Sequence, residues 1–229
     1  MQQEKIAVAL YGLPGSGKGT QANLIANKYG LVNFDTGRYL ETLWYDPKRQ
    51  KDPVVKRERK LFEEGKLNTP SFVLNEVSKA VTKLAKKGHG VCFSGSPRTM
   101  PEATTLIPLL EKLYSKKGVS FFLLDIDPKD TLERNGKRML CKVCRTPLLV
   151  KYYPRVTAKY CPACGGALYR RTLDNATIIP KRIEEYQNRT APILKFLKAS
   201  GHKVKKVNGR PAPYIVFEYI DREIRKNLQ

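Results

Sequence analysis

Short apolar runs alternate with longer amphipathic stretches along most of the chain. The apolar runs predict five strands, near Ile6–Leu10, Leu31–Phe34, Val91–Phe93, Val119–Leu124 and Lys203–Val207. The amphipathic stretches predict helices near Lys18–Lys28, Arg38–Trp44, Val54–Glu64, Ser71–Lys87, Pro101–Ser115, Pro128–Met139, Ala176–Ala199 and Pro213–Lys226. Such alternation is typical of a parallel sheet whose crossover helices lie on both faces. The pattern therefore predicts an α/β fold around a five-stranded parallel sheet.

The stretch 140–170 breaks this alternation, and we interpret it as a small inserted module. It contains four of the five cysteines and no long helical period. The pairs Cys141-x2-Cys144 and Cys161-x2-Cys164 are separated by sixteen residues, a spacing expected of a four-thiolate zinc site. Such a zinc ion is structural because four thiolates leave no open position. Iron in the same tetrahedron and disulfides are the alternatives, and a cytoplasmic location disfavours disulfides.

Charge is the unusual part of the composition. Forty-three lysine and arginine residues against 21 acidic residues give a net charge of +22. This excess predicts attraction to polyanions, with RNA as the obvious candidate; a solvated basic surface is the alternative, because the basic residues are spread along the chain. No apolar run reaches the roughly 18 residues of a membrane-spanning helix, and the first residues lack the apolar region of a leader. We expect a cytoplasmic monomer without a membrane partner.

The segment YGLPGSGKGT, residues 11–20, follows the first predicted strand and opens onto a predicted helix. Glycines allow backbone N–H groups to wrap an anion closely, and the helix N-terminus adds its positive end. Lys18 is expected to reach the outer phosphates of a nucleotide. The predicted phosphate-binding residues are Gly12, Pro14, Gly15, Ser16, Gly17, Lys18, Gly19 and Thr20. A glycine-rich turn without a ligand is the alternative, and the strand–loop–helix context disfavours it.

Several segments, in order along the chain, resemble the adenylate kinase family of nucleoside monophosphate kinases. GLPGSGKGTQ resembles the family's phosphate loop, FDTGRYLE the segment lining the monophosphate pocket, and EEGKLNT a stretch of the small domain that closes over that nucleotide. FSGSPRTMPEA resembles the segment that supplies a phosphate-binding arginine and a base-reading side chain. LERNGKRMLCKVC and CPACGGALYRRTLDN are similar to the two halves of a metal-binding lid, and KRIEEYQNRTAPILKF to the arginine-bearing helix after it.

The resemblance implies a P-loop NTPase-type sheet with two mobile appendages. The core would comprise residues 1–37, 88–139 and 172–229, with a helical NMP-binding segment at 38–87 and a zinc lid at 140–171. The implied reaction is reversible phosphoryl transfer, NTP plus NMP giving two NDP, with Mg²⁺ bridging the donor's phosphates. Arginine suits two neighbouring phosphates because its planar fork binds their oxygens bidentately.

The resemblance also implies roles for individual side chains. The implied catalytic residues are Lys18, Arg98, Arg138, Arg171 and Arg182. Arg134 is implied to stack on the donor base. The implied acceptor-binding residues are Thr36, Gly37, Arg38, Leu67, Asn68, Gly95, Arg98 and Glu102. For each arginine taken alone, a solvated surface residue is the alternative.

Five positions depart from the family pattern. Arg38 replaces an acid, Glu41 a phosphate-binding arginine, Ser94 an aspartate that helps hold magnesium's water shell, and Leu173 a lid acid. Glu102 replaces the glutamine that reads adenine. A carboxylate only accepts hydrogen bonds, which suits guanine or the amino group of cytosine. We therefore expect an acceptor preference shifted or broadened away from strict AMP.

The lost acids leave a second hypothesis. The chain would then be a catalytically weak nucleotide-binding protein of this fold that binds RNA or ribosomes through its basic surface. The intact glycine loop, Lys18 and the phosphate-binding arginines favour the kinase.

Overall fold

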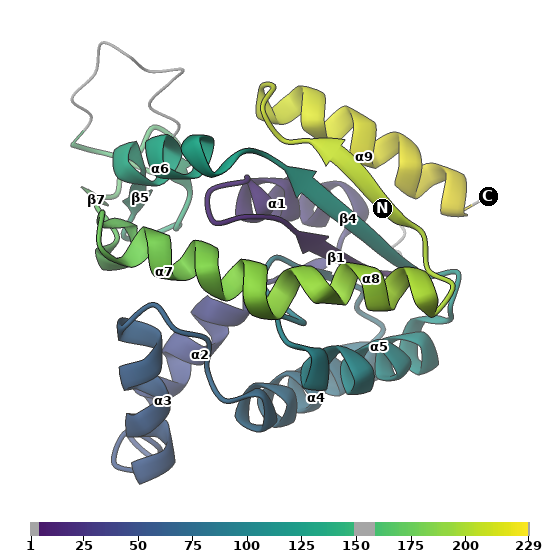
Figure 1. The fold of residues 1–229 in the computed structure, drawn as a ribbon, viewed down its shortest axis with the longest axis horizontal. Coiled ribbons are helices and arrows are strands. Elements are labelled where there is room, and N and C mark those ends of the chain that lie inside the picture. The colour runs from purple at the N-terminus through teal and green to yellow at the C-terminus, as the bar shows by residue number, and fades with distance from the viewer. Residues whose placement is uncertain (1–4, 149–158, 229) are drawn as a thin grey trace.

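A five-stranded parallel sheet forms the centre of the molecule (Figure 1). The computed structural model describes residues 5–148 and 159–228. The strands follow the order β2-β3-β1-β4-β8 and comprise β1 (Ala7–Tyr11), β2 (Val32–Phe34), β3 (Val91–Phe93), β4 (Val119–Asp125) and β8 (Val204–Asn208). All five predicted strands are confirmed. β1 and β3 are buried along their whole length because helices cover both faces of the sheet.

Each face of the sheet carries its own hydrophobic core. Phe122 packs with Ile25 and Ile220 under α1 (Lys18–Tyr29) and α9 (Pro213–Leu228). Its neighbour Phe121 points to the opposite face, as alternate residues of a strand do. There it joins a core formed with α4 (Pro70–Lys86), α5 (Met100–Tyr114) and α8 (Ala191–Ala199). The predicted α/β class is confirmed.

The remaining helices lie toward the end of the sheet where the functional residues gather. They are α2 (Thr36–Trp44), α3 (Pro53–Glu63), α6 (Pro128–Lys137) and α7 (Ile178–Glu185). Asp35 caps α2 by accepting a hydrogen bond from the Arg38 amide at 3.2 Å. Proline occupies the first turn of α3 and α6, where its missing N–H costs nothing.

The predicted helix Ala176–Ala199 is interrupted. α7 and α8 are joined by a π-helical turn, Tyr186–Thr190, and run nearly end to end across the molecule (Figure 1). Pro192, in the first turn of α8, has no N–H to donate to the preceding turn. A wider turn absorbs this mismatch and keeps the two segments connected.

The cysteine module, residues 140–171, carries a small antiparallel sheet with strand order β6-β5-β7. Its strands are β5 (Met139–Cys141), β6 (Pro147–Leu148) and β7 (Leu168–Tyr169). The helix predicted over Pro128–Met139 ends at Lys137, because Met139 pairs with Leu148 in this sheet. Part of the predicted module, residues 149–158, lies outside the described residues. None of the helices in the described ranges is long and apolar enough to cross a membrane.

Candidate active site

A cavity of about 670 Å³ lies at the carboxyl ends of the parallel strands, between the glycine loop, α2, α7 and the cysteine module. This edge is where open α/β sheets bind their ligands. All the catalytic and triphosphate-binding residues named from the sequence line it: Gly12, Pro14, Gly15, Ser16, Gly17, Lys18, Gly19, Thr20, Arg98, Arg134, Arg138, Arg171 and Arg182. The acceptor-binding candidates Gly37, Arg38, Leu67 and Gly95 also line it, and Thr36, Asn68 and Glu102 are not among its lining residues.

The loop between β1 and α1 is shaped by two glycines, Gly12 and Gly15, at which a side chain would be strained. Gly12 has φ +141°, and a Cβ there would lie 2.4 Å from the carbonyl oxygen of Leu124. Gly15 has φ +81°, and a Cβ there would lie 2.7 Å from the side-chain nitrogen Nδ2 of Asn135. Side chains rarely adopt such positive φ values. The sequence thus produces a tight loop that leads directly into a helix N-terminus, the geometry of an anion site.

Lys18 folds back over this loop. Its Nζ donates hydrogen bonds to the carbonyl oxygens of Gly12 (2.6 Å) and Leu13 (2.9 Å). Burial lowers the pKa of Lys18 well below its ordinary value, and the guanidinium groups of Arg98 and Arg182 lower it further. The ammonium group therefore lies among like charges, and an anion placed between them would relieve the repulsion.

Arg138 and Arg182 meet at one carboxylate. Asp174 is almost fully buried and accepts two hydrogen bonds from Arg138, at 2.8 and 2.6 Å, and one from Arg182 at 3.2 Å. Burial, with the guanidinium of Arg171 as the next cause, lowers the pKa of Arg182 to about 9. Burial also lowers the pKa of Arg98. One carboxylate thus orders two arginines but cannot neutralise the whole cluster.

Arg134 lies at the opposite end of the cavity from α2. Its guanidinium donates to the carbonyl oxygens of Gly209 (2.9 Å) and Arg210 (3.2 Å), in the turn after β8. Pro211 and Val216 line the cavity beside it. These hydrogen bonds hold the planar guanidinium at the cavity, an arrangement suited to stacking on a base.

The three acceptor candidates outside the lining have local partners. The Thr36 hydroxyl donates to Ser96 Oγ at 2.9 Å, and Asn68 donates to the carbonyl oxygen of Glu58 at 2.7 Å. Glu102 is buried in the first turn of α5, where it accepts a hydrogen bond from the Arg98 amide at 2.9 Å and one from the Thr99 hydroxyl at 2.8 Å. Burial raises the pKa of Glu102. Its carboxylate thus caps its own helix and fixes the backbone of Arg98.

Sequence reasoning missed several residues of the cavity wall. Asp35 and Arg145 line the cavity, as do Pro211, Pro213 and Val216 beside Arg134. The signal for Pro211 and Pro213 was the sequence NGRPAP between a predicted strand and a predicted helix, which places a turn at the same edge of the sheet. The position of Arg145 directly after Cys144 marked it only as part of the metal module.

The four cysteines of the module converge on one point. Their sulfur atoms all lie within 4.8 Å of one another, with 3.4 Å between Cys141 and Cys164 and 3.6 Å between Cys144 and Cys161. Tetrahedral Zn–S bonds of ~2.3 Å separate sulfur atoms by about 3.8 Å. The cluster therefore fits a zinc ion held by Cys141, Cys144, Cys161 and Cys164, as predicted. Cys92 is buried in β3, away from this cluster.

Comparison with known proteins decides the family. The family model described as adenylate kinase matches residues 10–202. The adenylate kinase of Methanothrix thermoacetophila is similar at 30% identity over 219 residues, which covers 96% of this chain and 98% of that protein. The adenylate kinase of Bacillus subtilis is 31% identical over 203 residues, covering 89% and 90%. The chain belongs to the adenylate kinase family.

Membership of this family shows that the chain is an enzyme. The chain is a phosphotransferase of the nucleoside monophosphate kinase type, and its substrates are nucleotides. Adenylate kinases use Mg²⁺ with ATP, and this chain has four thiols positioned to hold zinc. The adenylate kinase of Elusimicrobium minutum, at 30% identity over 220 residues, covers 96% of the chain and 98% of its own length.

Proposed function

We propose that the enzyme transfers a phosphoryl group reversibly from ATP to a nucleoside monophosphate, giving two nucleoside diphosphates. The convergence of Lys18 with Arg98, Arg138 and Arg182 in one cavity supports this above all. In the part of the chain that the structure describes, Asp174 is the one buried carboxylate that forms ion pairs with any of these four cations. Such crowding suits the charge of adjacent phosphates, and fixed cations stabilise the transferring group without reorganising.

The donor and the acceptor would approach from opposite ends of the cavity. We assign the donor triphosphate to the glycine loop, from Gly12 to Thr20, with its base against Arg134. The acceptor would lie toward α2 and Leu67, with its phosphate at Arg98. Arg138, Arg171 and Arg182 would contact the transferred group from the module side and from α7.

Magnesium would be held mainly by the donor's phosphates. Mg²⁺ prefers hard oxygen ligands and keeps several waters. The Thr20 hydroxyl and the Asp35 carboxylate both line the cavity, and the charge of Asp35 acts on both Lys18 and Arg98. Asp35 is thus an acid available to bind magnesium's waters where Arg38 and Ser94 provide none. The bound ion would neutralise charge that builds on the phosphates during transfer.

Two parts of the chain would move during the reaction, although α4, within residues 38–87, stays packed in the core against the sheet. We propose that residues 38–87 bind the acceptor and that the zinc-bearing residues 140–171 close as a lid over a core of residues 1–37, 88–139 and 172–229. Closure would exclude water, which otherwise competes with the acceptor for the phosphoryl group.

The acceptor base follows from Glu102. Each of its carboxylate oxygens accepts one hydrogen bond and retains capacity for another. No side-chain amide at this position is present to match both the donor and the acceptor on adenine. We therefore propose a preference shifted or broadened beyond AMP, toward guanine, whose edge offers two donors, or toward the amino group of cytosine.

A coupled assay across AMP, GMP, CMP and UMP tests both proposals. Turnover with any acceptor in the presence of Mg-ATP supports the kinase, and no turnover with all four contradicts it. Comparable rates with two or more acceptors, together with a preference in Glu102→Gln that is restricted toward AMP, support the role of Glu102. AMP dominance by a large factor, unchanged in Glu102→Gln, rules that role out.

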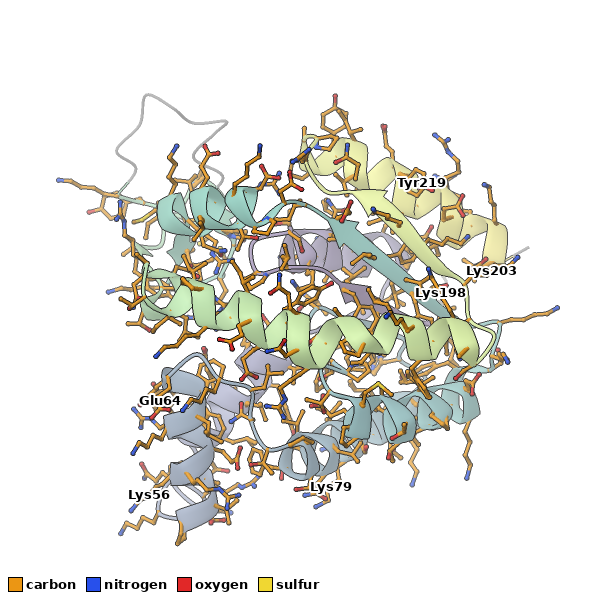
Figure 2. All side chains as sticks on the ribbon, viewed as in Figure 1. Lys56, Glu64, Lys79, Lys198, Lys203 and Tyr219 are labelled. Atoms are coloured by element: carbon orange, nitrogen blue, oxygen red, sulfur yellow. The ribbon has the colours of Figure 1, made fainter. Side chains whose placement is uncertain are left out.

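A second candidate function rests on the basic surface. Lys79, Lys83, Lys86 and Lys87 line a shallow groove on and beside α4, and none of the ion pairs between described residues includes them. Figure 2 shows Lys79 on this helix. We propose that the groove binds a polyanion such as RNA, alongside the kinase activity. Retention on RNA that falls with salt and is lost when these lysines become glutamine supports this; retention unchanged by the substitutions refutes it.

We further propose that the protein is a cytoplasmic monomer. Light scattering on the purified chain should give the mass of one copy. A dimeric mass would contradict this proposal.

A further inference from the structure

Glu41 joins two parts of the molecule that are far apart in sequence. It lies on α2, and its carboxylate accepts a hydrogen bond from Arg145 at 2.8 Å and one from Arg171 at 3.4 Å. Both arginines belong to the cysteine module. Among the ion pairs of residues 5–148 and 159–228, these two connect the helical segment to that module. All three side chains are only 22–30% exposed.

Arg145 occupies a left-handed turn position that glycine fills more easily. Arg145 follows Cys144 with φ +62°, and its amide donates to the Cys141 carbonyl oxygen at 3.2 Å. Gly165 follows Cys164 in the same way, with φ +71° and a bond to the Cys161 carbonyl oxygen at 2.8 Å. Glycine adopts this left-handed conformation without an energy penalty, whereas for other residues it raises the conformational energy. Strained residues of this kind occur where function holds them.

The Arg145 guanidinium is held from the module side and presented to Glu41. It donates to the Tyr169 hydroxyl and lies 5.6 Å from the centre of the Tyr169 ring, within cation–π range. Arg171 is held in turn from α3, where its guanidinium lies 5.9 Å from the centre of the Phe62 ring. Glu41 therefore lies between two arginines whose positions are already restricted, which lowers the entropy cost of pairing.

We propose that Glu41 is a positioning residue that latches the cysteine module onto α2 through Arg145 and holds Arg171 at the cavity. The negative charge of Glu41 draws two module arginines toward α2 before any phosphate arrives. The inference about Arg171 rests on the proposed function, whereas the latch itself does not.

The latch should shift the balance between closed and open forms only modestly. Partly exposed ion pairs that share a carboxylate are weak individually, so the closed-to-open ratio should change roughly two- to five-fold when one is removed. A contact of this strength can still break when product is released. It should also weaken as salt is added.

The test measures the distance between α3 and the module in the zinc-loaded, nucleotide-free protein. Noncanonical amino acids replacing Lys56 and Lys142 carry the two labels, because the native cysteines are needed for zinc. Lys56 lies on the outer side of α3 (Figure 2), and Lys142 is exposed in the module. Arg145→Gly is the decisive variant because glycine suits the left-handed turn. It should keep the zinc and melt at or above the wild-type temperature.

The expected result is a roughly two- to five-fold fall in the ratio of short-distance to long-distance populations in Arg145→Gly. In Glu41→Ala the ratio should fall at least as much, and the double variant should behave as Glu41→Ala alone. Arg170→Ala removes a charge from an exposed residue of the same module and should leave the distances unchanged. KM for the acceptor should rise by a similar factor in Arg145→Gly, while kcat does not fall.

Unchanged distances in Arg145→Gly, or an equal shift in Arg170→Ala, would overturn the latch. Additive effects of Glu41→Ala and Arg145→Gly would overturn it as well, because independent residues cannot form one contact. Distances that shift in a chain without kinase activity would leave the latch standing and refute the proposed function. Kinase activity with unchanged distances in Arg145→Gly would support the proposed function and refute the latch.

Discussion

Replacing Lys18 with methionine separates its role in transfer from any role in folding. Methionine keeps much of the length of the side chain but loses the ammonium group and its hydrogen bonds to Gly12 and Leu13. Those bonds are worth about 1 kcal/mol each. Their loss is offset because burial and neighbouring guanidinium groups already disfavour the charged form of Lys18. The free energy of unfolding should therefore change by no more than about 1 kcal/mol.

Turnover should respond far more strongly. Removing one fixed donor from a developing phosphate charge costs about 2.7–4 kcal/mol, which is a 10²- to 10³-fold loss in kcat. A coupled assay measures turnover and denaturant unfolding measures stability. Lys28→Met is the matched control on the same helix, because Lys28 pairs with Asp221 outside the cavity. Its rate should be unchanged. A near-normal rate in Lys18→Met, or a stability loss large enough to explain the lost rate, would refute the reasoning.

Three further predictions concern the loop, the metal and the charge of Lys18. Gly15→Ala should lower the free energy of unfolding by about 1–3 kcal/mol in chemical denaturation, because the added Cβ would meet the Asn135 side chain. Gly19→Ala should raise it by about 0.5–1 kcal/mol, because residue 19 lies in a helix with open space around it. Equal effects of the two substitutions would contradict the loop geometry. Metal analysis should find one zinc per chain, lost in Cys144→Ala and retained in Cys92→Ala; retention in both would remove the cluster as the site. Nucleotide binding at alkaline pH should take up protons in titration calorimetry, because a bound phosphate raises the lowered pKa of Lys18. Affinity should therefore fall as the pH rises and free Lys18 loses its proton. No proton uptake, or uptake that persists in Lys18→Met, would contradict this.

The fold could be predicted well because its signals are local. β1 and β3 are apolar on both faces, so they appear as continuous runs in the sequence. Helix starts were marked by proline. The break between α7 and α8 was not predicted, because a π-helical turn preserves the apolar periodicity while shifting its register. The end of α6 was missed because pairing of Met139 with Leu148 depends on a strand that follows later.

The site was predicted only as far as motifs reach. The glycine loop could be named because its spacing carries the chemistry, and the arginines could be named from the resemblance to the adenylate kinase family. The contacts of Glu102 could not, since its position in the motif does not reveal that it accepts hydrogen bonds from Arg98 and Thr99. Arg145 and Glu41 are separated by 104 residues, and only the folded chain brings them together.

A crystal structure with a bisubstrate analogue, two nucleosides joined by a polyphosphate, tests the central claim most directly. One nucleoside should lie against Arg134 and the other toward α2, with Lys18, Arg98 and Arg182 contacting the central phosphates. Those three side chains directed away from the phosphates in a closed molecule would contradict the account.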